Sequence, residues 1–144
     1  MQPKIKITGQ KELFKKLAQF GDEAERMVES ITQVTAEEIA TNAKQNAPTN
    51  FGKLRQSIHA RKEGHLFHTV YVNNVPIGAY VEFGTGAFVD VPNEWVDMAW
   101  QFYVNGKGYL RPQPYLYPAY IRGKAQYEND LRQLLEHLTK KHSK

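Results

Sequence analysis

The chain has 144 residues, the size of one ordinary domain with a single core, and its lack of cysteine excludes a disulfide framework and a thiolate metal site. Nineteen Lys and Arg against fifteen Asp and Glu give a formal net charge of +4, and the pI of about 9.2 favours a polyanionic partner without identifying one. The N-terminal stretch MQPKIKITGQ lacks the apolar core of a signal peptide, and no run of about eighteen apolar residues follows, so we expect a soluble protein that starts in the cytosol.

Residues 10–47 are predicted to be helical. Apolar residues at helical spacing indicate a short first helix that ends at Gly21, a residue suited to a helix C-terminus. Asp22 is expected to cap a second helix, which runs to about Asn46 before Pro48 stops it. The apolar stripe of this second helix is rich in alanine towards its end, so we expect another element to approach its backbone closely there.

Residues 54–86 are rich in β-branched and aromatic residues and are predicted to form strands. Glu63-Gly64 is expected to form the turn of a hairpin between the first two strands. A third strand is expected from Ile77 to Phe83, ended by Gly84 and Gly86. Because the connections are short, the sequence predicts an antiparallel meander.

The last part of the chain begins with an aromatic insert at residues 87–108. This insert contains Trp95 and Trp100, and it is expected either to cover the sheet or to contact a neighbouring molecule. A proline-rich segment follows, and apolar spacing predicts a final helix from Pro118 to about Lys140, so that residues 109–140 form the last region. The fold class predicted from these elements is a single α+β domain over residues 1–144, in which a long N-terminal helix and a C-terminal helix pack on the antiparallel sheet.

Three histidines close to Glu63 suggest a metal site, which the strand geometry argues against. Side chains alternate along a strand, so His65 and His68 would point to opposite faces of the sheet, while His59 lies in the preceding strand. A zinc site needs three or four convergent ligands. We therefore predict no metal and no cofactor.

Glu82, in the stretch AYVEFGTGAF, is the main candidate for a catalytic carboxylate. Spacing indicates no second titrating group beside it, and the sequence contains no GxSxG, HExxH or phosphate-loop motif, so we predict that the protein is not an enzyme. The alternative is that Glu82 is a fixed polar anchor. It would accept backbone N–H groups from a turn or pair with an arginine across an interface, for which the candidates are Arg55, Arg61 and Arg111.

Three short motifs occur in order along the chain: AKQNAPTNFGKLRQSI, YVEFGTG and QPYLYPA. With these motifs, from about residue 10 to residue 140, the chain resembles the tail-completion or head–tail joining proteins of the neck of long-tailed bacteriophages and prophages. The residues that match the family's pattern are Ala47, Pro48, Gly52, Leu54, Arg55, Ser57 and Ile58, then Tyr80, Glu82, Phe83, Gly84 and Thr85, then Pro114, Tyr115, Leu116, Pro118 and Ala119. The chain departs from the pattern in residues 49–51, in the tyrosine at 115 where phenylalanine is usual, and in the length of the insert.

The resemblance implies a structural virion protein that joins a DNA-filled head to a separately built tail. It implies a fold similar to that of tail-terminator proteins and a ring of identical subunits, with a hexamer or a dodecamer as candidate copy numbers. The expected partners are neighbouring neck and tail proteins, and DNA that passes through the channel without sequence-specific binding, with no membrane involved. The protein would be in the host bacterial cytoplasm during assembly and in the virion afterwards.

For such a ring, we expect residues 80–86, including Gly86, and residues 112–118 to help form the contact between subunits. The aromatic insert, with Trp95, Trp100, Phe102 and Tyr103, is expected to pack on a neighbour or on the tail tube. Two other classes stay open from the residues themselves. One is a basic nucleic-acid-binding module, and the other is a small hydrolase that uses Glu82.

Overall fold

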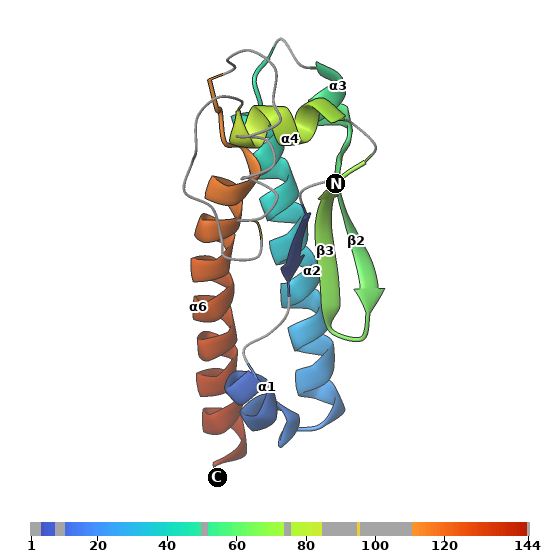
Figure 1. Ribbon diagram of the computed structural model, residues 1–144. Coiled ribbons are helices and arrows are strands. Elements are labelled where there is room, and N and C mark those ends of the chain that lie inside the picture. The colour runs from blue at the N-terminus through green and yellow to red at the C-terminus, as the bar shows by residue number, and fades with distance from the viewer. Residues whose placement is uncertain are drawn as a thin grey trace.

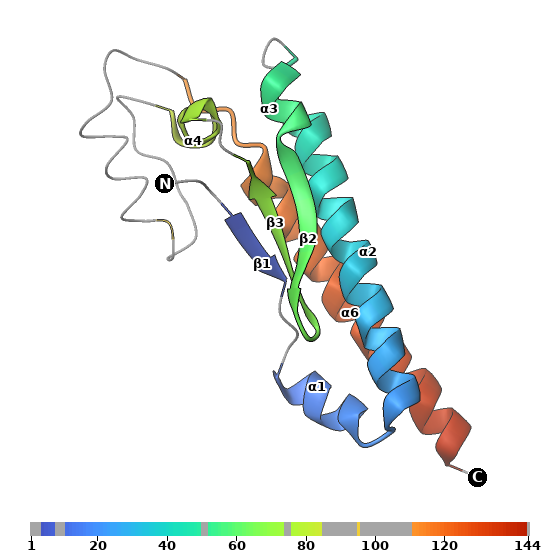
Figure 2. The ribbon, with the colours of Figure 1, turned by 90° about the vertical axis from the view of Figure 1, so that its right-hand side faces the viewer.

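The computed structural model describes residues 4–7, 11–49, 52–73, 76–84, 95 and 111–143. In chain order the elements are β1 (Lys4–Ile7), α1 (Lys11–Ala18), α2 (Asp22–Asn46), α3 (Gly52–Gln56), β2 (Ile58–Gly64), β3 (Phe67–Val72), α4 (Pro76–Phe83) and α6 (Leu116–His142). Helices α2 and α6 lie side by side along the length of the molecule, and the sheet packs on α2 (Figures 1 and 2). The predicted α+β class, with long helices beside an antiparallel sheet, is confirmed, although α6 packs mainly on α2 rather than on the sheet.

The two N-terminal helices meet at Gly21. Its φ of 76° lies in the left-handed region, which glycine adopts without steric cost. The N–H groups of Phe20 and Gly21 close α1 by donating to the carbonyls of Leu17 and Ala18. The expectation that Asp22 caps α2 is wrong, because Gly21 occupies the N-cap position and no side chain caps that end. Asp22 instead lies in the acidic first turn, which complements the helix dipole.

The end of α2 is where the sequence predicts it. The helix ends at Asn46, and Ala47 then has an extended conformation with φ −64° and ψ 139°. Extended backbone is the conformation that the residue before a proline prefers, and Pro48 follows directly. Ala47 still donates its N–H to the carbonyl of Ala43, which completes the last turn.

Helices α2 and α6 are antiparallel and pack closely. A Cβ atom added at Gly123 of α6 would clash with the side chain of Ile39 of α2, so the absence of a side chain at residue 123 sets the helix separation there. Further along the same interface, the Thr32 hydroxyl donates to the carbonyl of Val28, and the Tyr127 hydroxyl lies 2.8 Å from the Thr32 hydroxyl. Since the Thr32 proton is already used, Tyr127 is the donor of this buried hydrogen bond.

The sheet has the strand order β1-β3-β2, and both pairs are antiparallel. The hairpin of β2 and β3 was expected, but its turn lies at residues 65–66 rather than at Glu63-Gly64, with Leu66 at a φ of 55°. The segment from Leu54 to Ser57 is mostly helix α3, so β2 begins at Ile58. The third strand is β1, from the N-terminus, so the sheet is not made of three consecutive strands.

The strand expected from Ile77 to Phe83 is wrong, because this segment is helix α4. A short apolar run is compatible with a buried strand and with a buried helix, and periodicity alone does not distinguish them. Pro76 favours the helix, since proline is well tolerated in a first turn whose N–H groups have no partner within the helix. Among the described residues, no helix is long and apolar enough to cross a membrane.

Candidate functional site

Glu82 lies on α4, and its side chain is 2% exposed. Its Oε2 atom accepts the backbone N–H of Tyr115 at 2.7 Å and that of Leu116 at 3.2 Å. Its Oε1 atom accepts the backbone N–H of Tyr117 at 2.8 Å. These three residues are the N-cap and the first two residues of α6, so Glu82 caps this helix from another element.

This arrangement accounts for all the free N–H groups at the start of α6. The first four N–H groups of a helix have no partner within the helix. Glu82 accepts three of them, and the fourth position is Pro118, which has no N–H. The positive end of the helix dipole further favours a carboxylate at this place. Glu82 therefore stabilises the junction of α4 and α6, which we call the α4–α6 junction.

Other hydrogen bonds hold the same junction. The Tyr115 hydroxyl donates to the carbonyl of Gly78 at 3.0 Å, and the backbone N–H of Gln113 donates to the carbonyl of Val81 at 2.8 Å. Asn46, at the end of α2, donates its side-chain amide to the carbonyl of Tyr115 at 3.2 Å. The second and third sequence motifs therefore meet at one place, which also contacts the end of α2.

The chemistry of Glu82 at this place is that of an anchor. Burial raises the pKa of its carboxyl above the ordinary value of 4.5, and the backbone hydrogen bonds from Tyr115, Tyr117 and Leu116 oppose this shift. Burial likewise raises the pKa of the Tyr115 hydroxyl, and the Glu82 charge adds to the effect. Because both carboxylate oxygens of Glu82 are occupied and buried, the geometry does not offer a base to a substrate.

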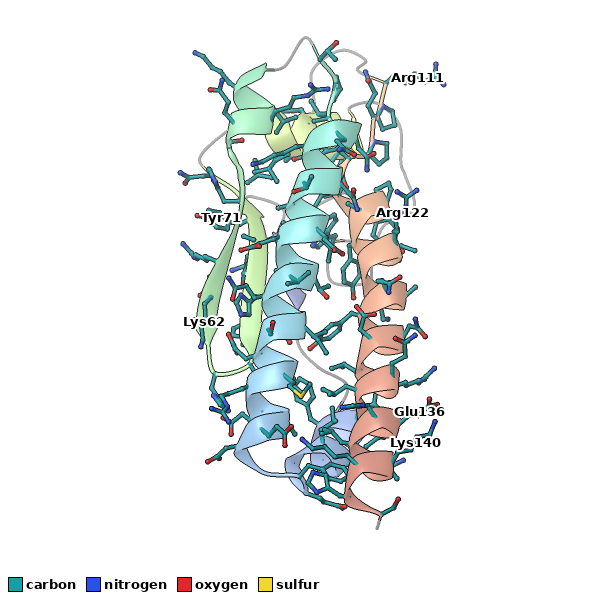
Figure 3. The ribbon with its side chains drawn as sticks, turned by 180° about the vertical axis from the view of Figure 1, so that it is seen from behind. Lys62, Tyr71, Arg111, Arg122, Glu136 and Lys140 are labelled. Atoms are coloured by element: carbon teal, nitrogen blue, oxygen red, sulfur yellow. The ribbon has the colours of Figure 1, made fainter. Side chains whose placement is uncertain are left out.

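The described partners of Glu82 are backbone N–H groups and not the arginines that were considered. Arg55 donates from Nε at 3.2 Å and from Nη2 at 2.9 Å to the carbonyl of Ala47, so it joins α3 to the end of α2. Arg61 donates to Glu63 at 2.6 Å on the surface of β2. Arg111 is exposed, away from the sheet (Figure 3).

The first sequence motif forms α3 and its junction with β2. Leu54 and Ile58 are fully buried. Ser57 lies between them, and its hydroxyl donates to the carbonyl of Leu54 at 2.7 Å. The carbonyl of Ser57 accepts the N–H of Asn73, which fixes the start of β2 beside the end of β3. The motif residues therefore position the elements around α2.

Aromatic side chains fill the space beside the α4–α6 junction. The ring of Trp95, 4% exposed, meets that of Phe83 edge-on at 5.6 Å between centroids. The ring centroid of Tyr117 lies 6.4 Å from that of Trp95. The expectation that Trp95 packs on a neighbouring molecule is therefore wrong, because its ring is buried in its own chain. Gly84 follows α4 with a φ of 69°.

The other predicted site residues divide into two groups. Tyr115 and Leu116 are fully buried, whereas Tyr80, Pro114 and Pro118 are exposed and stay candidates for contacts with another molecule. The remaining candidates lie outside the described residues: Thr85, Gly86, Trp100, Phe102 and Tyr103, with all of the insert 87–108 except Trp95.

The histidines have separate partners. His68 is buried on β3, and its Nε2 lies 2.9 Å from Oε1 of Glu29 on α2. His65 lies in the hairpin turn, 2.7 Å from Glu25 and largely exposed. In the part of the chain that the structure describes, no cluster of three or more Asp, Glu or His side chains has a geometry that could hold a metal ion.

Glu29 is a polar residue that the sequence reasoning missed. Burial raises its pKa, but the hydrogen bonds from His68 and Lys62 outweigh this effect, and the pKa of Glu29 is lowered. Lys62 lies 3.2 Å from the same carboxylate oxygen. The pattern of acidic residues in α2 gave no signal that distinguishes Glu29, since its partners come from β2 and β3.

The comparison with protein families decides the class of this protein. The model of the HK97-gp10-like family, described as "Bacteriophage HK97-gp10, putative tail-component", matches residues 11–84, just over half of the chain. The chain belongs to the HK97-gp10-like family. The resemblance to phage tail proteins is thus confirmed, and the description of the family indicates a structural component of the tail. The match includes Glu82 and ends before the α6 residues that Glu82 caps.

Two further comparisons of this HK97-gp10-like chain, with curated proteins and with solved structures, found no match. The expected likeness to tail-terminator folds therefore stays an expectation.

Proposed function

We propose that this HK97-gp10-like protein is a structural component of the phage or prophage neck, where it completes the tail and joins it to the DNA-filled head as part of an oligomeric ring. The family match carries this proposal, because it assigns the chain to the phage tail. The order of the three motifs supports the finer assignment to the neck. The partners would be other copies of the chain, neighbouring neck and tail proteins, and DNA that passes without sequence-specific contacts.

The use of the motif residues supports a structural role. Arg55 and Glu82 each bind backbone groups of another segment, so that α3 is held to the end of α2 and α4 to the start of α6. The Ser57 hydroxyl binds the carbonyl of Leu54 at the end of α3 itself. A subunit of a ring needs such a rigid body, because small rotations of each subunit add up around the ring. A hydrolase that uses Glu82 as its base is not favoured, since the carboxylate is buried and fully hydrogen-bonded.

Deletion of the gene from the phage or lysogen that carries it tests this function. We expect DNA-filled heads and complete-length tails to accumulate separately in the lysate, and electron microscopy would count joined and unjoined particles. Supply of the chain from a plasmid should restore joining. Normal numbers of infectious, joined particles without the chain would contradict the proposal.

The place of the chain in the particle is tested separately. Mass spectrometry of purified virions should detect the chain, and cryo-electron microscopy should locate it at the junction of head and tail. The host cytoplasm is where it would assemble, so the same chain should be present in the soluble fraction before lysis. Its absence from virions and from free tails would exclude a role as a virion component.

A further inference from the structure

The outer face of the sheet carries a group of basic and aromatic side chains. His68 points from β3 towards α2, and because side chains alternate along a strand, Tyr71 points to the outer face. The register places Lys4 of β1 and His59 of β2 on either side of Tyr71. The guanidinium of Arg61 lies 4.5 Å above the Tyr71 ring. We call Lys4, His59, Arg61 and Tyr71 the basic face.

The basic face is exposed along its two edge strands and positively charged. Lys4 and His59 are exposed, and the Arg61 side chain is 59% exposed. Glu63 pairs with Arg61 at 2.6 Å and offsets one of these charges. The Tyr71 ring, half-buried between the rings and charges of its neighbours, provides apolar area at the centre. Tyrosine and arginine are the residue types that most often dominate protein interfaces.

An acidic surface lies on the side of α2 opposite its buried residues. Val34, Glu37, Glu38, Thr41 and Asn42 line a shallow hollow of about 390 Å³, and we call them the acidic strip. Val34 is 48% exposed, although it is a large apolar residue. The acidic strip thus combines two carboxylates with an apolar centre, and it complements the basic face in charge and in apolar content.

The two surfaces cannot meet within one chain. Helix α2 lies against the inner face of the sheet (Figure 2). The basic face therefore points away from α2, because His68 points towards it. The acidic strip lies on the side of α2 away from its buried stripe. Contact between two basic faces, or between two acidic strips, would bring like charges together and is disfavoured. The arrangement that remains is contact between the basic face of one copy and the acidic strip of another.

We propose that the basic face of one copy binds the acidic strip of the next copy in a head-to-tail contact. In this contact Tyr71 packs against Val34, and Arg61 and Lys4 pair with Glu37 and Glu38. A contact between two different surfaces of the same chain forms a ring if its rotation closes. The inference rests on the proposed function, since it names the subunit contact of the proposed ring.

Cysteine cross-linking tests the contact directly, because the natural chain has no cysteine. A chain with both Glu38→Cys and Arg61→Cys should give a ladder of covalent multimers when virions or free tails that contain it are treated with the thiol oxidant diamide. Chains with only one of the two substitutions should stay monomeric under the same treatment. Absence of the ladder, or equal dimer formation by a single-cysteine chain, would overturn the proposal.

Charge reversal tests the complementarity. The pair Glu37→Lys and Glu38→Lys, and separately the pair Lys4→Glu and Arg61→Glu, should each weaken self-association about tenfold or more, as measured by sedimentation velocity or by yield of joined particles. All four substitutions in one chain should restore association, because the two surfaces exchange their charges. Failure of this restoration, with the chain still folded by circular dichroism, would overturn the proposal.

The matched control is Arg122→Glu with Lys124→Glu, on exposed positions of α6. Arg122 projects from α6 on the side of the molecule away from Tyr71 (Figure 3). This control should associate like the natural chain, and an equal loss would mean that net charge alone matters, which would overturn the assignment of the two surfaces.

The experiments also separate a nucleic-acid surface from a protein contact. If Lys4→Glu with Arg61→Glu abolishes binding to a short DNA duplex and leaves self-association in sedimentation velocity unchanged, the basic face binds phosphate and the proposal is wrong. If virions contain the chain but no ladder forms, the subunit contact is wrong and the structural role stands. If virions and tails lack the chain, the proposed function itself fails.

Discussion

The carboxylate of Glu82 accepts the backbone N–H of Tyr115 at 2.7 Å, although 33 residues separate the two in the sequence. This bond joins the end of α4 to the start of α6, and the bonds to Leu116 and Tyr117 extend it. A single side chain therefore connects the part of the chain that the family model matches with the C-terminal helix, which lies outside the match.

Substitution of Glu82 should lower the stability of the whole domain. Glu82→Gln keeps one acceptor oxygen but places an NH₂ group against backbone donors, and we expect a loss of about 1–3 kcal/mol in the free energy of unfolding. Glu82→Ala leaves all three N–H groups without a partner, and it should cost more than Glu82→Gln. Urea denaturation of the purified chain measures both losses. The exposed Glu136→Gln on α6 is the control, and an equally small effect of all three substitutions would contradict the role of Glu82 (Figure 3).

Substitution of Gly123 tests the close approach of α2 and α6. Gly123→Ala gains about 1 kcal/mol of helix propensity, but its Cβ clashes with the buried Ile39, so we expect a net loss of stability. Adding Ile39→Ala removes the clash, and the double variant should lose less stability than the sum of the two single variants.

Gly52→Ala provides the matched control, since a Cβ at Gly52 meets no atom within 4 Å. This control should be neutral or slightly stabilising. Strict additivity of Gly123→Ala and Ile39→Ala in thermal or urea unfolding would show that the two residues do not limit the helix separation.

Glu29 should make the stability of the domain depend on pH in the acidic range. Its folded pKa is lowered from 4.5 because the hydrogen bonds with His68 and Lys62 outweigh burial. A lowered folded pKa gives a stabilisation that is present above the unfolded pKa and is lost as the pH falls through the folded pKa. Glu29→Gln should therefore flatten the fall in unfolding free energy below about pH 5.

Glu82 acts in the opposite direction in the same experiment. Burial raises its pKa, so its contribution to stability is largest below 4.5 and decreases as the pH rises through the folded pKa. Comparison of Glu29→Gln and Glu82→Gln across the same pH series should thus give changes of opposite sign. Parallel profiles for the two variants would show that one of these assignments is wrong.

Trp95 should stabilise the isolated chain, whereas Val34 should not. Trp95→Ala removes a buried ring that packs on Phe83 and Tyr117, and it should cost about 3–5 kcal/mol. Val34→Ala removes an exposed side chain, and it should change the unfolding free energy by less than about 0.5 kcal/mol. Thermal and urea unfolding measure both, and a neutral Trp95→Ala would contradict the buried position of the ring.

The helices were predictable because their signals are local. Gly21 and Pro48 mark the two ends of α2, and the apolar spacing between them has the helical period. The hairpin was also predictable, although the turn is displaced by about two residues, a usual error for strand ends.

The parts that could not be predicted depend on distant residues. The segment from Pro76 to Phe83 is apolar on most sides, so its period does not separate helix from strand. As a helix it brings Gly78 close to Val72 of β3 and to Tyr115, which is distant in the sequence. The pairing of β1 with β3 joins the two ends of a segment of more than 60 residues. The role of Glu82 as an anchor was foreseen, but its position at the start of α6 was not.

The hydrogen bond between Gln113 and Val81 places the two ends of the intervening segment next to each other, beside the three bonds of Glu82. When the two ends of a connection are fixed in this way, doubling its length costs only about 0.6 kcal/mol of closure entropy. We therefore expect insertions or deletions within this stretch to leave the packing of α2 and α6 unchanged. The α4–α6 junction thus holds both ends of this stretch in place whatever the length between them.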